Sequence, residues 1–222
     1  MKDIPIFICN FNRLGPTKDL VESLLKRDYN NITIIDNASK YPPLLEWYEK
    51  CPATVVKLEV NLHQGIFNLL PQFDHIRCNG FYVWTDSDIV PVEETPKDFL
   101  DHMVEIILEY GMPKLGLSLK LDDIPDHYKH KEEAIKHESI FTKLGHIDSK
   151  YGIVWKAPID TTFAICATPD CGLCQEAYRM NWPYTARHIP WYYDSDNLPE
   201  DEKFMRANRN PQVGTQWSAK EG

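Results

Sequence analysis

The chain has 222 residues, of which 43% are hydrophobic and 12% aromatic, and its formal net charge is −9. These values suit a globular domain with a substantial core, and the negative charge argues against a nucleic-acid partner, because Lys and Arg supply most of the affinity for phosphate backbones. No apolar run approaches the roughly 20 residues that cross a bilayer, and the apolar start of the chain becomes polar too soon for a signal peptide, so we expect a cytoplasmic protein without a transmembrane segment.

The first half of the chain alternates segments typical of strands with segments typical of helices. We expect strands at residues 5–9, 32–35, 54–58 and 81–85, and helices at residues 16–27, 42–51 and 65–73. In the first of these helices, Leu20, Val21 and Leu24 recur at helical spacing, and Pro16 suits a helix start. The alternation predicts an α/β fold: a single domain with a mostly parallel central sheet flanked by helices.

The second half of the chain is less regular. We expect helices at residues 99–110, 132–141 and 173–180, strands at residues 115–121, 163–167 and 188–193, and a polar loop over the rest of 122–150. Beyond Pro199 the composition becomes polar, which indicates a short exposed helix followed by a frayed tail.

The most informative motif is Phe-Tyr-Val-Trp-Thr-Asp-Ser-Asp at residues 81–88. Bulky residues suited to a buried strand run directly into Asp86 and Asp88. Open α/β sheets bind ligands at the carboxyl ends of their strands, and carboxylates placed there can hold a hard divalent cation against a phosphate. The motif therefore predicts a phosphorylated or nucleotide-linked ligand.

Polar residues also follow the first two expected strands. Asn10, Asn12 and Arg13 come after the first strand, and Asp36 comes after the second. Each alone fits ordinary turn chemistry, since Asn and Asp favour turns. Their convergence with Asp86 and Asp88 on one sheet edge indicates a binding site.

In this order, the stretches 10–13, 36–39 and 85–88 resemble the nucleotide-sugar glycosyltransferases of the GT-A fold, most closely the family 2 type with an Asp-x-Asp motif. Residues 61–65 also resemble the Asn-x-x-x-Gly stretch of those enzymes. The resemblance is good over residues 1–90 and rests beyond them on order and spacing.

The resemblance implies a hexosyl- or deoxyhexosyltransferase of glycan biosynthesis, which uses a nucleoside-diphosphate sugar, typically a UDP-sugar, together with Mn²⁺ or Mg²⁺. Asp36 would accept a hydrogen bond from the base. The remaining nucleotide-binding residues that it implies are Asn10, Asn12, Arg13 and Gly65.

At the Asp-x-Asp motif, the resemblance implies that Asp86 contacts the ribose or reaches the metal through water, and that Asp88 binds the metal directly. A cation in this position neutralises charge on the departing nucleoside diphosphate and acts as a Lewis acid on the leaving group.

Roles in the second half follow from the resemblance by position. Inverting members of the fold use a carboxylate as general base for the acceptor hydroxyl; Asp160 is the first choice, with Glu176 and Asp170 as fallbacks. His188 is the best-placed further ligand for the metal or the diphosphate, and Arg187 beside it can meet phosphate.

The candidates for stacking on a sugar ring are Trp155, Trp191 and Tyr192, although such aromatics more often belong to the core. We divide the single domain 1–222 into a nucleotide-binding half (1–95), an acceptor-side half (96–200) and a tail (201–222). Its expected partners are a nucleotide-sugar donor and a glycan or other glycoconjugate acceptor, with transfer inverting the anomeric carbon.

Other functions remain open at this point. Phosphatases of the haloacid dehalogenase type also carry Asp-x-Asp, but after the first strand of their core; here the motif follows the fourth strand, although Asp122 and Asp123 can mimic their late acidic pair. A nucleotidyltransferase would open on a glycine-rich phosphate loop, which the start of the chain lacks. A degenerate module would bind nucleotide sugars without turnover.

Overall fold

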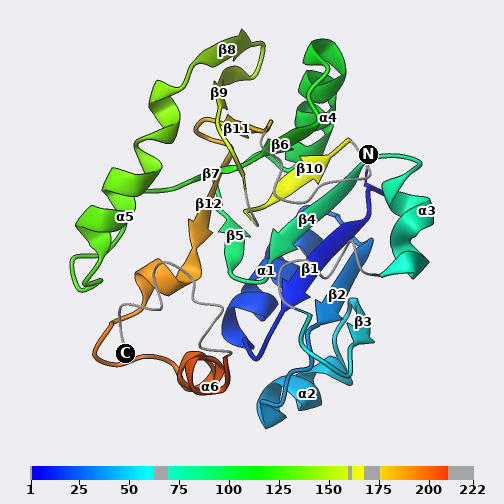
Figure 1. Cartoon of the computed structure of the whole chain (residues 1–222), viewed down its shortest axis with the longest axis vertical. Coiled ribbons are helices and arrows are strands. Elements are labelled where there is room, and N and C mark those ends of the chain that lie inside the picture. The colour runs from blue at the N-terminus through cyan, green and yellow to red at the C-terminus, as the bar shows by residue number, and fades with distance from the viewer. Residues whose placement is uncertain (1, 63–69, 160–161, 168–175, 210–222) are drawn as a thin grey trace.

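The structure, a computed structural model, describes residues 2–62, 70–159, 162–167 and 176–209 and is built around a large central sheet (Figure 1). Among these residues, the central sheet has nine strands in the order β3-β2-β1-β4-β10-β6-β11-β9-β8, and a smaller sheet has three in the order β5-β12-β7.

The strands are β1 (Ile6–Asn10), β2 (Ile32–Asp36), β3 (Thr54–Lys57), β4 (Tyr82–Asp86), β5 (Ile89–Pro91), β6 (Lys114–Gly116), β7 (Ser118–Leu119), β8 (His146–Ser149), β9 (Gly152–Lys156), β10 (Ala164–Cys166), β11 (Tyr178–Met180) and β12 (Thr185–His188). The α-helices are α1 (Gly15–Leu25), α2 (Pro42–Tyr48), α3 (Asp74–Arg77), α4 (Phe99–Tyr110), α5 (Lys131–Glu138) and α6 (Glu200–Asn208). Short 3-10 helices are η2 (Pro71–Phe73), η3 (Phe141–Lys143) and η4 (Ile189–Tyr192).

Most strands of the central sheet run in one direction. The strands β3, β2, β1 and β4 pair in parallel. Because β10 is antiparallel to both β4 and β6, β6 returns to the first direction, and β11 follows it in parallel. Since β9 is antiparallel to β11 and β8 is antiparallel to β9, seven of the nine described strands point one way. The predicted α/β class with a mostly parallel central sheet is confirmed.

The helices pack on the sheet through the apolar residues whose spacing predicts the helices. Leu20 and Leu24 of α1 are fully buried in the main core, together with Phe99 and Met103 of α4. The ends of the sheet are far apart, with β3 beside α2 and β8 near α5 (Figure 1). No helix in the described part of the chain is long and apolar enough to cross a membrane.

The second half departs from expectation at residues 146–156, where a hairpin, β8 and β9, replaces part of the expected loop. The expected helix at 173–180 is also wrong where it is described, because residues 178–180 form β11 between β6 and β9. Pairing on both edges outweighs the helical pattern of so short a segment. Residues 173–175 lie outside the described residues.

The expected strands at 115–121 and 188–193 are displaced. The first divides into β6 and β7, which join different sheets. The last strand, β12, already ends at His188, and η4 follows it. Pro190 lacks the N–H that a strand would donate, which favours this turn.

The expected helix at 65–73 lies mostly outside the described residues; Pro71 to Phe73 form a 3-10 turn instead. The expected helix after Pro199 exists as α6, but it is not simply exposed, because Asp201 and Glu202 are buried.

Gly116 in β6 lies where neighbouring atoms leave no room for a side chain. A Cβ at this position would lie 2.6 Å from Cδ1 of Ile159 and 2.9 Å from the backbone oxygen of Phe163. We expect Gly116→Ala to lower the free energy of unfolding by about 1–3 kcal/mol, the usual cost of overpacking, as measured by urea denaturation. Gly80→Ala is the matched control, because a Cβ there meets nothing within 4 Å; equal effects of the two substitutions would contradict this packing.

Candidate functional site

The carboxyl ends of β1, β2 and β4 lie side by side, because Asn10 is in register with Asp36 and Cys9 with Asp86. A chain of hydrogen bonds ties these ends together. Ser87 Oγ donates to Asn10 Oδ1 over 2.8 Å, and Asn10 Nδ2 donates to the Tyr48 hydroxyl over 2.8 Å. That hydroxyl in turn donates to Asp36 Oδ1 over 3.0 Å. The polar strand ends predicted to converge therefore form one connected network.

Asp36 and Asn12 also fix the loops around this edge. The backbone N–H of Ser39 donates to Asp36 Oδ2 over 3.1 Å, and those of Lys40 and Tyr41 donate to Asn12 Oδ1 over 2.7 and 3.1 Å. Asn12 has a φ of 59°, a left-handed conformation that asparagine tolerates better than most residues. The turn roles of these residues are thus real, and each carboxylate oxygen of Asp36 keeps further capacity as an acceptor.

Asp88 is the buried charge at the centre of the site, with an exposed fraction of 3%. Nη1 of Arg13 lies 2.7 Å from its Oδ2, and Nε2 of His188 lies 3.4 Å from the same oxygen. Burial raises the pKa of Asp88, but Arg13 and His188 outweigh that effect and hold the pKa well below its usual range. Asp88 is therefore a carboxylate at neutral pH.

His188 reaches this point through the smaller sheet. The antiparallel pairing of β12 with β5 sets His188 opposite Ile89, and the Ile189 N–H donates to the backbone oxygen of Asp88 over 2.9 Å. The His188 ring also meets Trp191 edge-on, with ring centroids 4.8 Å apart. The fold thereby brings together His188 and Asp88, two residues a hundred positions apart.

The C-terminal helix α6 holds Arg13 from the other side. Nε of Arg13 lies 2.9 Å from Oε2 of Glu202, whose other oxygen accepts from Arg206 over 2.9 Å. The carboxylate of Asp201 accepts the backbone N–H groups of Leu14 and Gly15 at the start of α1, over 2.9 and 2.8 Å. Burial lowers the pKa of Arg13, but Asp88 and Glu202 raise it to well above its ordinary value. Arg13 is a permanent cation shared by two buried carboxylates.

Negative charge gathers at the strand ends. Burial raises the pKa of the Cys9 thiol, and the charges of Asp86, Asp88 and Asp36 raise it further. Three carboxylates thus act on one side chain near the end of β1, and such a cluster of negative charge complements a cation. A diphosphate would need that cation between itself and the carboxylates.

The unsatisfied atoms at this point suit a cation. Asp88 Oδ1 and His188 Nδ1 are both buried without a hydrogen-bond partner among the described residues. A buried carboxylate oxygen left without a partner is costly, and it is the kind of ligand that hard divalent cations take. Within the described residues no three His, Cys, Asp or Glu side chains gather into a metal-binding group. Mg²⁺ sites commonly use only one or two carboxylates and complete their shell with substrate phosphates and water, so the residues fit a cation that arrives with a diphosphate.

A cavity of about 450 Å³ lies beside these strand ends, within the size range of small-molecule sites. It is lined by residues from the loops after β1, β2 and β3 and from the region of α6: Phe11, Asn12, Ala38, Lys40, Glu59, Val60, Asn61, Asn208 and Arg209. Of the predicted nucleotide-binding residues, Asn12 lines this cavity, whereas Asn10 and Asp36 hold the loops that surround it.

The remaining predicted residues either lie outside the described part of the chain or have other surroundings. Gly65, Asp160 and Asp170 lie outside the described residues. Glu176 is exposed, next to β11. Trp191 is buried in a small core cluster with Ile124, Tyr128 and Ala134. Trp191 is therefore a core residue, the alternative to sugar stacking that the sequence also allows.

Arg187 and Tyr192 pair with Asp123 instead of facing Asp88. Nη2 of Arg187 lies 2.6 Å from Oδ2 of Asp123, and the Tyr192 hydroxyl donates to Oδ1 over 2.5 Å. Asp123, one member of the acidic pair weighed for a phosphatase, is thus occupied by structural contacts.

Sequence reasoning missed the contributions of Tyr48, Asp201 and Glu202. Tyr48 lies in the helix expected at 42–51, but nothing in that segment shows that its hydroxyl joins Asn10 to Asp36. Glu202 lies 189 positions from Arg13, and in a polar segment an acidic residue looks like any solvated one. No local pattern marks either contact.

The structure was compared with known proteins. No protein-family model and no curated protein matches the chain. Among solved structures it is similar to a mannosyltransferase from Pyrobaculum calidifontis in complex with GDP-Man and Mn²⁺, at 12% identity and a TM-score of 0.52, over 92% of this chain and 59% of that chain. It is also similar to a cytidylyltransferase from Leptospira borgpetersenii serovar Hardjo-bovis, at 14% identity and a TM-score of 0.38, over 64% of this chain and 72% of that chain.

The first likeness shows a GT-A-like fold. The chain spans 59% of the length of that mannosyltransferase.

The ion pairs of Glu202 give a test of how α6 is anchored. Burial raises the pKa of Glu202, but the ion pairs with Arg13 and Arg206 lower it by more than burial raises it. The pKa of Glu202 therefore lies below its ordinary value. We expect Glu202→Gln to cost about 2 kcal/mol of unfolding free energy at pH 7, the scale of hydrogen bonds to charged groups, as measured by urea denaturation. The cost should shrink as pH falls through the lowered pKa, because protonation then removes the same ion pairs.

Glu200→Gln is the matched control on the same helix, since the Glu200 side chain is 78% exposed and, among the described residues, its ion pair is with Lys203 of the same helix. A cost for Glu202→Gln no larger than that of Glu200→Gln would show that α6 is not held through Arg13.

Proposed function

We propose that the protein is a metal-dependent glycosyltransferase that moves a sugar from a nucleoside-diphosphate sugar to a hydroxyl acceptor. The observation that carries the proposal is the buried Oδ1 of Asp88, just after β4, which has no hydrogen-bond partner among the described residues. A ligand-sized cavity also lies at the loops after β1, β2 and β3. The GT-A-like fold supports it, because in such sheets a ligand lies across the carboxyl ends of the strands.

In this proposal the nucleoside occupies the cavity lined by Asn12, and the diphosphate points toward Asp88. The Asp36 carboxylate would accept a hydrogen bond from the base. It lies beneath the loop at residues 37–39, which it holds through the Ser39 N–H. Val60 gives the cavity an apolar side chain that is 61% exposed, suited to cover by a ribose or a base. We propose two candidates for the base. The sequence resemblance favours uracil, and the GDP-Man bound by the similar mannosyltransferase suggests guanine.

Asp88 would hold Mn²⁺ or Mg²⁺ through Oδ1, with Asp86 beside it and His188 as a further contact. When bound, the cation would neutralise the charge of the departing nucleoside diphosphate. Arg13 orients the carboxylate by holding Oδ2, and Glu202 holds Arg13 in turn. Because Arg13 keeps its charge at any physiological pH, it holds the Asp88 carboxylate in this orientation over that whole range.

Asp160 remains the proposed general base. It would take the proton of the acceptor hydroxyl as that oxygen attacks the anomeric carbon, and this single displacement inverts the carbon. Asp160→Asn is expected to abolish transfer while leaving donor affinity unchanged, since an amide cannot accept the proton. Transfer assays and donor titrations on the same preparation measure the two effects; near-normal transfer would remove Asp160 from this role.

Donor turnover tests the proposal as a whole. We expect slow release of UDP or GDP from one member of a panel of UDP-glucose, UDP-galactose, UDP-N-acetylglucosamine and GDP-mannose, dependent on Mn²⁺ and stopped by EDTA. Asp88→Asn should lower the rate about 100-fold, the scale on which loss of one electrostatic contact to a leaving group acts. The same donor should raise the melting temperature of the wild-type protein in Mn²⁺, because it binds only the folded state.

Asp126→Asn is the matched control, since the Asp126 side chain is 98% exposed on the distant surface before α5. Release of inorganic phosphate from sugar phosphates would point to a phosphatase. Donor stabilisation without any turnover would point to a nucleotide-sugar-binding module.

A further inference from the structure

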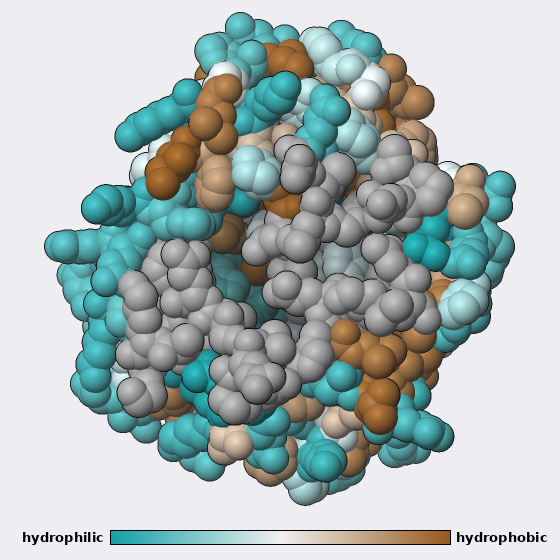
Figure 2. Space-filling model, viewed as in Figure 1, coloured by the Kyte–Doolittle hydropathy of each residue, from teal (hydrophilic) through white to brown (hydrophobic). Residues whose placement is uncertain are grey.

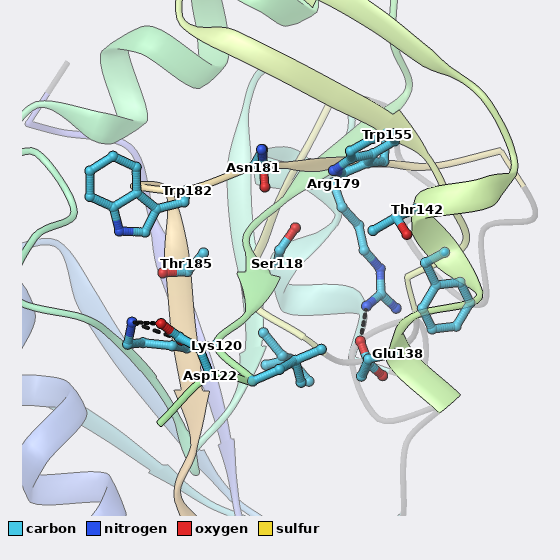
Figure 3. A pocket seen from close by; sticks show the side chains of 13 residues that line it. Ser118, Lys120, Asp122, Glu138, Thr142, Trp155, Arg179, Asn181, Trp182 and Thr185 are labelled. Carbon is cyan, nitrogen blue, oxygen red and sulfur yellow. Dashed lines mark hydrogen bonds and ion pairs between the residues drawn. The ribbon is translucent and has the colours of Figure 1, made fainter. Parts of the chain in front are cut away.

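A second cavity, of about 300 Å³, lies in the acceptor-side half of the chain. Figure 3 shows Trp182 on one side of it and Trp155 with Arg179 on the other, with Ser118 and Asn181 between them. Its lining comes from β7, β9, β11 and β12, from the segment that follows β7, and from α5 and η3. Hydroxyl and amide groups from Ser118, Thr142, Thr185 and Asn181 are among the lining residues.

Exposed apolar side chains lie at this cavity and in the segment beside it. Trp182 lines it and is 62% exposed, and Ile140 and Leu144, which flank the lining residues Phe141 and Thr142, are 50% and 54% exposed. Figure 2 shows a band of hydrophobic residues over the segment between α5 and β8. Exposed apolar groups rimmed by polar ones commonly mark a binding groove.

The charged groups of the lining compensate one another. Lys120 lies 2.9 Å from Asp122, and Arg179 lies 2.7 Å from Glu138. These pairs leave the lining with two positive and two negative groups, and each cation already has a carboxylate partner. Such a cavity offers little to a phosphate or another anion, which needs a cation that is free to meet it. It suits a neutral ligand that brings its own hydroxyl groups.

A sugar ring has that chemistry. Its C–H face packs on an aromatic ring, and its hydroxyls exchange hydrogen bonds with hydroxyl and amide side chains. The cavity combines the indoles of Trp155 and Trp182 with such polar groups.

One strand, β12, contributes both to this cavity and to the site at Asp88. Thr185 lines the cavity, and His188, three residues further along β12, pairs with Asp88. Three residues of extended strand span about 10 Å, a separation that a short oligosaccharide covers.

We propose that this cavity binds a neutral saccharide and is the acceptor subsite of the enzyme. The assignment as acceptor rests on the proposed glycosyl transfer, whereas saccharide binding can be measured without any donor. Trp182 and Trp155 would pack on the sugar, and a neighbouring sugar unit of the same acceptor would extend toward Asp88.

Binding is tested by ¹⁵N-edited NMR of the six tryptophan indole N–H groups, with Trp182→Phe and Trp155→Phe assigning two of the signals. Maltose, cellobiose, lactose and mannobiose are the probes, and inorganic phosphate is the anionic comparison. At least one disaccharide should shift the Trp182 and Trp155 signals in a saturable way, and phosphate should not. If none of the disaccharides moves either signal, the saccharide site is wrong.

Trp182→Ala is expected to weaken this binding at least tenfold, and because the side chain is largely exposed the fold should survive. Trp155→Phe gives a second reading, with a smaller loss of affinity. Leu108→Ala is the matched control, an equally exposed apolar residue (68%) on α4. Equal affinities of Trp182→Ala and Leu108→Ala for the disaccharide would overturn the assignment.

The acceptor role is tested by adding the bound disaccharide to the donor-turnover assay. Release of nucleoside diphosphate should rise at least tenfold with a trisaccharide product, and this rise should be lost in Trp182→Ala. Binding without any saccharide-dependent turnover, in a protein that does hydrolyse the donor, would contradict the acceptor role alone. Absence of donor hydrolysis would contradict the proposed function and leave the binding result standing.

Discussion

The buried carboxylate of Asp88 is the constraint around which the site is organised. A charge removed from water must be compensated by nearby opposite charge, or its burial costs several kcal/mol. Here the compensation comes from Arg13 after β1 and His188 at the end of β12, and Arg13 needs Glu202 of α6 as its second partner. Three segments distant in sequence therefore meet at this carboxylate, and α6 joins them through Arg13. Loss of Arg13 would remove the ion pair that compensates the buried charge of Asp88.

Only one of the two carboxylate oxygens of Asp88 has a partner among the described residues. Arg13 and His188 both contact Oδ2 of Asp88, while Oδ1 is buried without a partner in the described part of the structure. A protein that needed Asp88 only for stability would satisfy both oxygens or replace the group by an apolar one. One satisfied oxygen holds the side chain in a fixed orientation, and the other is left for a ligand. The arrangement is the expected one for a carboxylate whose use is to hold a cation at the edge of a sheet.

The sequence predicts those features of the fold and the site for which the local residue pattern and the position in the chain agree. The strand ends at Asn10, Asp36 and Asp88 were predictable because parallel strands bring their carboxyl ends to one edge whatever the details of packing. His188 could be chosen by its place late in the chain. The contacts of Glu202 and Tyr48 were not predictable, since they depend on partners fixed only by the tertiary fold.

The second half was less predictable for the same reason. Short segments such as 178–180 carry little pattern of their own, and their state is decided by the strands beside them. The cavity between Trp155 and Trp182 is lined by several such segments, so the sequence does not assign either tryptophan to it, although Trp155 is a sequence-based candidate for a sugar contact.

The most direct test of the central claim is a crystal of the protein grown with Mn²⁺ and either UDP or GDP, with data collected at the manganese absorption edge. The account predicts an anomalous peak within bonding distance of Oδ1 of Asp88, next to diphosphate density, with Arg13 still holding Oδ2. A nucleotide bound in the cavity with no manganese at Asp88, or manganese bound elsewhere, would contradict it.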